Sequence, residues 1–262
     1  MDNKLKQILR KNRVIIWIYR LFKTIAVFPL KFTSFKVLQL SNFPLKDLFN
    51  PKKTSLLKTV VPYTKAGYPR LSNVYNLAKE IEEKKIVGSF VECGTWKGGC
   101  SAIMGAIANR YGTQRKTWYL DSFEGMPEPS EKDGSDTDEI AGDVLLASQK
   151  DVEELVFDKL KLPRENNIIV KGWFENTIPQ IKDKIGSIAI LRMDADWYEA
   201  TKFCLEQLYD KVVQGGYVIF DDYGRWQGCK QAVDEFFKAR DNHPRFQYIG
   251  NYGARVMYFK KV

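Results

Sequence analysis

The sequence is poor in the residues that build zinc sites and disulfide frameworks. It has one histidine, His243, and four cysteines, which form no CxxC pair and do not cluster with the histidine. Both kinds of site need such clusters, so neither is expected. Scattered thiols are typical of a reducing compartment, and we expect a cytoplasmic location.

Long apolar runs are missing too. The most apolar stretch, residues 14–30, is interrupted by Arg20 and Lys23 and closed by Pro29. It falls short of the ~20 predominantly apolar residues that a membrane-spanning helix needs. No small-residue cleavage site follows it, so a cleavable signal peptide is not expected either.

The basic residues are concentrated near the N-terminus. Residues 1–58 hold 13 of the 41 Lys and Arg and two of the 32 acids, which leaves 28 basic and 30 acidic residues for the remainder. A chain of 262 residues is long enough for one α/β domain and an extension. We therefore predict a basic arm at 1–58 and a catalytic domain at 59–262.

Apolar residues recur at helical spacing among the Lys and Arg of this arm: Leu5, Ile8, Ile15, Ile18, Phe22 and Ile25. Such a basic amphipathic segment can lie on an anionic membrane surface, which would place the protein peripherally at the inner face of the membrane. It can also mediate a homo-oligomer or cap the protein's own core. Nucleic acid is a disfavoured partner, although the arm is strongly basic and the rest of the chain is nearly neutral.

Strand-like and helix-like segments alternate through the rest of the chain. An irregular stretch is predicted for residues 52–69, with Tyr63 and Tyr68 as candidates for a lid, followed by a helix with Leu71 and Ile81 on its apolar face. Five strands and five helices then alternate: strands at 87–92, 117–121, 167–172, 188–194 and 216–222, and helices at 102–111, 152–160, 174–181, 198–212 and 229–240. Two closing strand-like runs flank residues 251–253, a hairpin signature.

Repeated strand–helix units imply a parallel sheet with helices on both faces. The predicted fold class is α/β: a Rossmann-like, mostly parallel seven-stranded sheet with helices on both faces and a C-terminal antiparallel hairpin. In such sheets, ligands bind in the crevice beyond the carboxyl ends of the strands.

The first strand turns into a helix through glycines, in the sequence FVECGTWKGGCS at residues 90–101. Gly94, Gly98 and Gly99 permit backbone geometry and close ligand approach that a Cβ would obstruct. We interpret this turn as a cradle for a nucleotide-type cofactor. A glycine-rich connection without a ligand is the alternative.

Acids end four of the predicted strands: Glu92, Asp121, Asp194 with Asp196, and Asp221 with Asp222. Since parallel strands share one carboxyl edge, these groups should converge on one rim. A single strand-end aspartate often caps the next helix. Capping does not account for the whole set, because the adjacent pair Asp221 and Asp222 cannot both cap.

The identity of the cofactor follows from two of these acids. Asp121, at the end of the second strand, suits the hydroxyls of a ribose. The glycines do not form GxGxxG, and Glu92 would repel a pyrophosphate, which argues against a nicotinamide-dependent oxidoreductase. A cofactor with a ribose, a cationic centre and no phosphate fits better, and S-adenosylmethionine is such a molecule.

Asp194, Asp221 and Asp222 offer hard oxygen ligands, and Mg²⁺ takes about one or two carboxylates directly and completes its shell with water or substrate oxygens. A metal there would position a substrate hydroxyl and lower its pKa. Asp196 is the candidate base that receives the proton. Its alternative role is to cap the helix that begins near Tyr198.

Five ordered motifs resemble one enzyme family: FVECGTWKGGCS, YLDSFEGMPEP, VKGWFENTIP, LRMDADWYEAT and GGYVIFDDYGRWQGCKQAVDEFF. The family is the macrocin/mycinamicin O-methyltransferases, class I methyltransferases that use S-adenosylmethionine and Mg²⁺ to methylate sugar hydroxyls of natural products. The resemblance covers roughly Tyr63 to Lys260. Trp197 departs from it, standing where an aliphatic residue is common, and the basic arm has no counterpart.

The resemblance implies a role for each site residue. Glu92, Gly94, Thr95 and Trp96 would line the methionine end of the cofactor, Asp121 and Ser122 would bind its ribose, and Gly172, Trp173 and Phe174 would border its adenine. Asp194, Asp221 and Asp222 match the metal ligands, and Asp196 matches the base. The segment 122–143 matches an acceptor-side loop.

The sequence therefore predicts an O-methyltransferase that methylates one hydroxyl of a vicinal diol. The acceptor would be a sugar on a glycan, a polysaccharide or a glycosylated natural product. A binding module for a membrane surface or a nucleic acid, built on a degenerate methyltransferase scaffold, is the alternative that the basic arm suggests. Such a module has no need of converging carboxylates.

Overall fold

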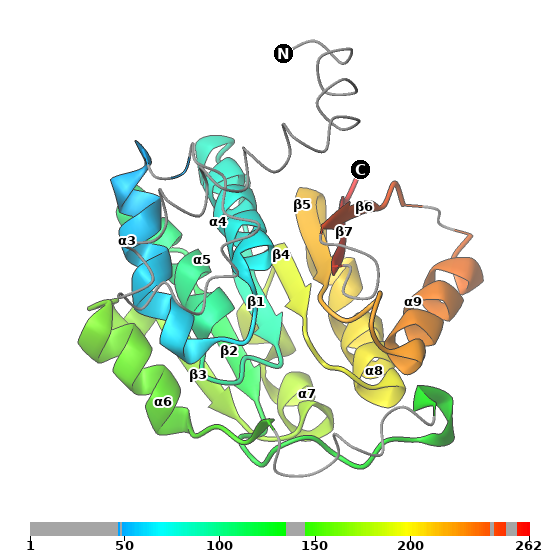
Figure 1. Cartoon of the computed structure of the whole chain (residues 1–262). Helices are drawn as coiled ribbons and strands as arrows, with labels where there is room; N and C mark the ends of the chain where they lie inside the picture. Colours follow the sequence, from blue (N-terminus) through cyan, green and yellow to red (C-terminus); the bar gives the residue numbers. More distant parts are fainter. Residues whose placement is uncertain (1–46, 48, 135–144, 242–243, 250–255) are drawn as a thin grey trace, which may run out of the picture.

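The computed structural model describes residues 47, 49–134, 145–241, 244–249 and 256–262 (Figure 1). Its centre is a seven-stranded sheet in the order β3-β2-β1-β4-β5-β7-β6. The strands are β1 (Ser89–Cys93), β2 (Thr117–Asp121), β3 (Asn167–Lys171), β4 (Ile188–Met193), β5 (Val212–Phe220), β6 (Gln247–Ile249) and β7 (Val256–Lys260). Strands β1 to β5 are parallel, and β7 is antiparallel to both β5 and β6.

The predicted fold class is thus confirmed, including the antiparallel C-terminal pair. The turn predicted between these two strands, residues 251–253, lies outside the described residues. Because the chain order reverses between β1 and β4, the loops after these two strands open a crevice at the carboxyl edge of the sheet.

Helices cover both faces of the sheet. They are α3 (Pro51–Val60), α4 (Tyr68–Glu83), α5 (Gly99–Tyr111), α6 (Gln149–Glu153), α7 (Phe174–Ile185), α8 (Tyr198–Leu208) and α9 (Gln227–Ala239). Adjacent strand residues belong to different cores: Phe90 packs in the cluster with α3, α4 and α5, and Val91 in the cluster with α7, α8 and α9. Both are fully buried, as expected for a strand covered on two faces.

The prediction of an irregular stretch at 52–69 is wrong, because α3 fills its first half. The side chain of Asn50 accepts a hydrogen bond from the Lys53 amide at 3.0 Å, and Pro51 occupies the first helical position, where no N–H is needed. The helix then buries Leu57 and Val60 in the core. Pro51 therefore starts a helix just before the stretch that was predicted to be irregular.

The prediction that Tyr68 belongs to a lid is also wrong. Tyr68 is the first residue of α4, is 2% exposed and packs in the core. Tyr63 lies nearer the surface, and its hydroxyl donates to Glu154 at 2.8 Å. This bond joins the loop before α4 to the segment after α6.

Several other predicted element boundaries differ from the structure. The helix expected at 152–160 is α-helical only to Glu153 and continues as a π-helix over Glu154–Lys159. Helix α7 continues past residue 181 to Ile185 and ends at Gly186, whose φ of 65° suits a residue without a Cβ. Strand β5 begins at Val212, four residues earlier than predicted, with an irregular register before Tyr217.

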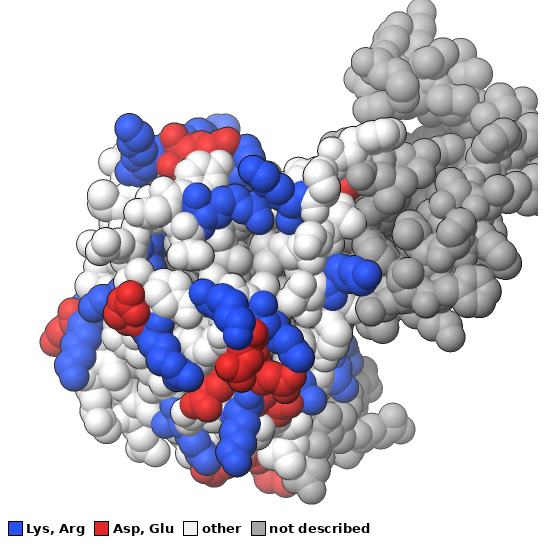
Figure 2. Space-filling model, turned by 90° about the vertical axis from the view of Figure 1, so that its left-hand side faces the viewer, with Lys and Arg blue, Asp and Glu red and all other residues white. Residues whose placement is uncertain are grey.

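Helix α3 runs across the predicted boundary between the arm and the domain at residue 58. Residues 1–46 of the arm, including its amphipathic segment, lie outside the described residues. Within the part of the chain that is described, no helix is long and apolar enough to cross a membrane. Figure 2 shows the face that includes α3 and α6, where Lys and Arg side chains alternate with Asp and Glu.

Candidate active site

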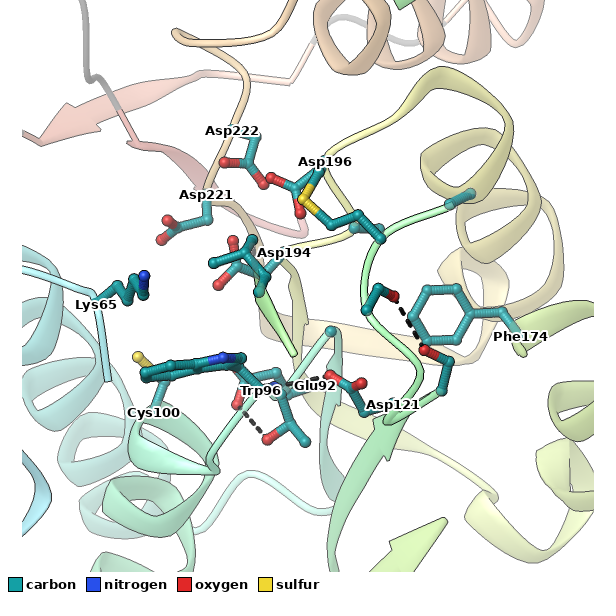
Figure 3. A pocket seen from close by; sticks show the side chains of 18 of the residues that line it. Lys65, Glu92, Trp96, Cys100, Asp121, Phe174, Asp194, Asp196, Asp221 and Asp222 are labelled. Atoms are coloured by element: carbon teal, nitrogen blue, oxygen red, sulfur yellow. Dashed lines mark hydrogen bonds between the residues drawn. The ribbon is translucent and has the colours of Figure 1, made fainter. Parts of the chain in front are cut away.

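A cavity of about 360 Å³ opens at the carboxyl edge of the sheet. Its floor is formed where β1, β2, β4 and β5 end, and the strand-end acids line it: Glu92, Asp121, Asp194, Asp221 and Asp222 (Figure 3). The convergence that the sequence predicted is present. Nearly all the predicted cofactor residues line the cavity, including Gly94, Thr95, Trp96, Ser122, Trp173 and Phe174; Gly172 does not.

The glycine turn is held to the end of β2 by Asp121. One carboxylate oxygen accepts from the Trp96 amide at 2.7 Å and the other from the Phe123 amide at 2.8 Å. Trp96 and Phe123 have φ values of 49° and 55°, a conformation that non-glycine residues adopt at some cost in energy. Burial raises the pKa of Asp121, and the backbone hydrogen bonds oppose that shift. A carboxylate offers about four acceptor sites, so these backbone donors leave room for a ligand hydroxyl.

Arg192 is the central residue that the sequence analysis missed. It lies on β4, is 1% exposed, and donates to Glu92, to Asp194 at 2.8 Å and to Asp221. The guanidinium therefore joins the ends of three strands. Burial raises the pKa of Glu92 to about 7, although Arg192 and the Ser101 hydroxyl, which both donate to this carboxylate, oppose the shift.

A second arginine reaches the same cluster from outside the sheet. Arg70, near the start of α4, donates to the carboxylate oxygen of Asp221 that Arg192 leaves free. Asp221 is thus an acceptor for two guanidinium groups while being 2% exposed. Its charge is compensated by side chains of the protein itself.

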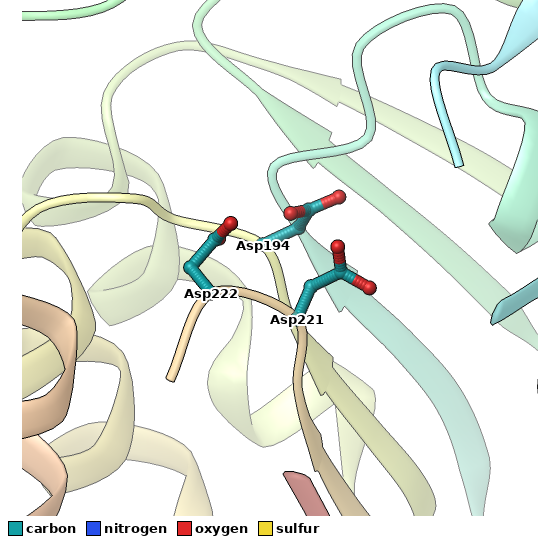
Figure 4. Close-up of side chains that lie close together, drawn as sticks. All are labelled: Asp194, Asp221 and Asp222. Atoms are coloured by element: carbon teal, nitrogen blue, oxygen red, sulfur yellow. The ribbon is translucent and has the colours of Figure 1, made fainter. Parts of the chain in front are cut away.

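Asp194, Asp221 and Asp222 bring ligand atoms within 4.8 Å of one another (Figure 4). Asp222 differs from the other two, because its buried Oδ2 has no hydrogen-bond partner among the described residues. Burial, followed by the charges of Asp196 and Asp194, raises its pKa well above the ordinary value. An orphaned carboxylate oxygen beside two other hard oxygen donors suits a divalent cation of the Mg²⁺ type.

Asp196 also lines the cavity, where it lies beside Asp222 and away from Asp221 (Figure 3). Its Oδ1 accepts from the indole N–H of Trp226 at 2.9 Å, and its φ is 54°. Burial, with the charge of Asp194 next in size, raises its pKa to about 7. The second carboxylate oxygen is left for a hydroxyl group in the cavity.

Asp196 does not cap the helix that follows it. Helix α8 has no side-chain cap at Trp197, and its first amide, that of Tyr198, donates instead to Asp133 at 2.7 Å. Asp133 comes from the loop after β2 and is 2% exposed, and it also accepts from the Ser130 amide. The alternative role for Asp196 is therefore filled by a residue that the sequence analysis did not single out.

Trp197, which stands where the family commonly has an aliphatic residue, supports the wall of the cavity from behind. Trp197 is 2% exposed and packs edge-on against Trp226, with ring centroids 5.3 Å apart. Its indole N–H donates to the carbonyl oxygen of Pro127 at 2.7 Å, so it fixes the loop after β2. Trp226 and Pro127 line the cavity, together with Met126. Residues 135–143 of the predicted acceptor-side loop lie outside the described residues.

The sheet order and the cavity at its carboxyl edge are those of a class I methyltransferase, a fold that implies S-adenosylmethionine as the methyl donor. Comparison with solved structures agrees: the O-methyltransferase NovP superposes with a TM-score of 0.68 at 32% identity, covering 76% of this chain and 82% of that chain. CalS11, a calicheamicin methyltransferase, has the same fold, with a TM-score of 0.64 at 20% identity over 87% of this chain and 89% of that one.

The macrocin-O-methyltransferase (TylF) family model matches residues 48–261, and the chain belongs to this family. Demethyldecarbamoylnovobiocin O-methyltransferase of Streptomyces niveus is 36% identical over 66% of this chain and 67% of that protein. Mycinamicin III 3''-O-methyltransferase of Micromonospora griseorubida is 30% identical over 77% of this chain and 79% of that protein. The resemblance inferred from the five motifs is therefore confirmed.

Proposed function

We propose that the protein transfers a methyl group from S-adenosylmethionine to one hydroxyl of a vicinal diol on a sugar, with Mg²⁺ as the metal. The acceptor would be a glycan, a polysaccharide or a glycosylated natural product. One relative, a tetracenomycin 4'-O-methyltransferase of Streptomyces olivaceus, is 33% identical to this chain over 67% of its length. The substrate in the name of that enzyme contains a rhamnosyl group. The observation that carries the proposal is the convergence of Asp121 with the carboxylates of β4 and β5 in one cavity.

The adenosine part of the cofactor would lie between two groups of residues. Asp121 and Ser122 would bind the ribose, and Trp173 and Phe174 would border the adenine, with Gly172 shaping the turn between them. Glu92, Gly94, Thr95 and Trp96 would line the methionine part. When bound, the cofactor supplies the methyl group on a sulfonium centre, so that orientation of the acceptor oxygen contributes much of the rate.

Asp194, Asp221 and Asp222 would hold Mg²⁺. The metal would act as a Lewis acid toward the two neighbouring hydroxyls of the acceptor. Asp222 is the group most in need of a cation, since its Oδ2 is buried without a partner among the described residues. Asp196 would take the proton from the hydroxyl that is methylated. The indole N–H of Trp226 orients this carboxylate through its Oδ1.

Calorimetric titration with S-adenosylhomocysteine, the demethylated product, tests the cofactor directly. We expect saturable binding, whereas a protein with no affinity for this compound would contradict the proposal. Methyl transfer to glycosides should require Mg²⁺ and stop with a chelator. Equal activity in the presence of the chelator would remove the metal from the proposed function.

The role of residues 1–58 stays a separate proposal. We favour contact between subunits or with an anionic membrane surface over nucleic acid. Removing residues 1–50, which leaves α3 in place, and measuring both sedimentation and liposome binding distinguishes these roles, since a change in only one of them identifies the partner.

A further inference from the structure

The cavity has two chemically different ends. In Figure 3, Phe174 and Asp121 lie at one end, Lys65 lies at the opposite end, and the indole of Trp96 lies between them. If Asp121 binds the ribose and Phe174 borders the adenine, the methionine part must extend past Trp96 toward Lys65. This direction follows from the covalent order of the cofactor, in which the ribose separates adenine from methionine.

A fixed loop presents Lys65 to the cavity. The Thr64 hydroxyl accepts from the Ala66 amide at 3.0 Å, and the loop packs directly on the start of α5. A Cβ on Gly99 would lie 2.6 Å from the Cβ of Thr64 and 2.8 Å from the carbonyl oxygen of Tyr63. The hydrogen bond from Tyr63 to Glu154 holds the other side of the loop. Gly99 is therefore required for this loop to approach the helix.

Two lysines lie over the same indole ring, and only one of them faces the cavity. The ammonium groups of Lys65 and Lys97 are 5.4 and 5.2 Å from the centre of the Trp96 ring. Lys97 forms an ion pair with Asp151 at 3.4 Å and does not line the cavity. Lys65 lines the cavity and forms no ion pair with any residue that the structure describes.

The other cation at this end of the cavity is already engaged. Arg70 lines the cavity, but its guanidinium donates to Asp221. The acids of the rim would repel a free carboxylate, because unit charges a few ångströms apart interact by several kcal/mol at an effective dielectric constant of about 20. An anion bound beside this rim needs a cation that no protein carboxylate occupies, and Lys65 meets that requirement.

We propose that Lys65 binds the carboxylate of the methionine part of the cofactor. The inference rests on the proposed function, because it takes the position of the adenosine part from Asp121 and Phe174. It assigns a cofactor-binding role to a residue outside the five motifs that resemble the family. Trp96 would form the surface on which the lysine stem and the methionine chain meet.

Calorimetry with two ligands and three proteins tests the assignment. The ligands are S-adenosylhomocysteine and its decarboxylated analogue, which keeps the adenine, ribose, thioether and amine and lacks only the carboxylate. The proteins are the wild type, Lys65→Met, and Lys97→Met as the matched control over the same indole. A Tm measurement on each protein confirms folding, which we expect for Lys65→Met because the side chain is exposed.

The expected result is selective. Lys65→Met should weaken binding of S-adenosylhomocysteine by about tenfold, as for the loss of one hydrogen bond between charged groups. Binding of the decarboxylated analogue should be unchanged or tighter, and Lys97→Met should leave the affinity of both ligands within about twofold of the wild-type value.

Two outcomes would overturn the assignment while leaving the proposed function intact. Equal weakening of both ligands would mean that Lys65 acts by packing on Trp96. Unchanged affinity for both would leave Lys65 to contact an anionic group of the acceptor instead. Failure of the wild type to bind S-adenosylhomocysteine would be a failure of the proposed function itself.

Discussion

Five of the acids that line the cavity fall into two groups that differ in their source of positive charge. Glu92, Asp194 and Asp221 form ion pairs with Arg192 inside the sheet; we call them the paired acids. Asp196 and Asp222 form no ion pair with the described residues, and within the same residues the donor to Asp196 is the indole N–H of Trp226; we call them the open acids. The paired acids are a preorganised frame, whereas the charge of the open acids needs a bound cation or a proton.

Removing the cation of the paired acids should have the largest effect. Arg192→Met would leave three converging carboxylates without their common partner, which should lower the free energy of unfolding by about 3–5 kcal/mol. Urea unfolding followed by circular dichroism measures this change.

Arg225→Met is the matched control for Arg192→Met, because Arg225 is exposed and stacks on Trp226 with its guanidinium carbon 4.5 Å from the ring centre. Its stability should stay within about 0.5 kcal/mol of the wild type. If the two arginine variants lost equal stability, the contrast between the paired and the open acids would have no energetic basis.

The position of the acids could be predicted from the sequence, but the partner of the paired acids could not. Strand ends follow from the alternation of apolar runs and helices, and parallel order brings those ends to one edge. Arg192 lies within a buried strand, and nothing local shows that its guanidinium meets Glu92, which is 100 residues away in the chain. Tertiary contacts of this kind have no signal in periodicity or spacing.

Some helix boundaries were predicted wrongly for a related reason. The stretch at 52–69 was predicted to be irregular, although Asn50 and Pro51 before it start α3 and the buried Leu57 and Val60 hold that helix to the core. The residue that caps α8 could not be predicted either, because Asp133 is 65 positions away from Tyr198, whose amide donates the hydrogen bond. Local rules identify candidates for a cap, and only packing selects among them.

The two adjacent aspartates at the end of β5 offer the next test, since one is paired and the other is open. Asp221→Asn loses one oxygen acceptor for Arg192 or Arg70, which should lower the free energy of unfolding by about 1–3 kcal/mol. Asp222→Asn removes a buried carboxylate that forms no ion pair with the described residues and whose Oδ2 has no hydrogen-bond partner there, and without metal it should raise stability by about 1 kcal/mol. Chemical denaturation in a chelator measures both.

Mg²⁺ sharpens this comparison. A ligand that binds only the folded state stabilises it by about 2.7 kcal/mol at a concentration of 100 times its Kd, so Mg²⁺ should raise the Tm of the wild type. Asp222→Asn should lose most of this increase. A stability change of the same sign in both variants, or an undiminished response of Asp222→Asn to Mg²⁺, would contradict the assignment of Asp222 as the acid that needs the cation.

The smallest effect on stability is expected for the open acid Asp196, which we compare with Asp133, the residue that accepts from the first amide of α8. Asp133→Asn turns one oxygen into an NH₂ group facing the Ser130 amide, which should lower the free energy of unfolding by about 1–2 kcal/mol. Asp196→Asn keeps the oxygen that accepts from Trp226 and removes only a buried charge, so its stability should equal or exceed that of the wild type.

The methyl-transfer rate of Asp196→Asn should nevertheless fall by a factor of about 10²–10⁴ if this carboxylate is the base. Denaturation and rate measurements on the same two preparations decide the matter, because a stability loss in Asp196→Asn with little change in rate would return this residue to a structural role.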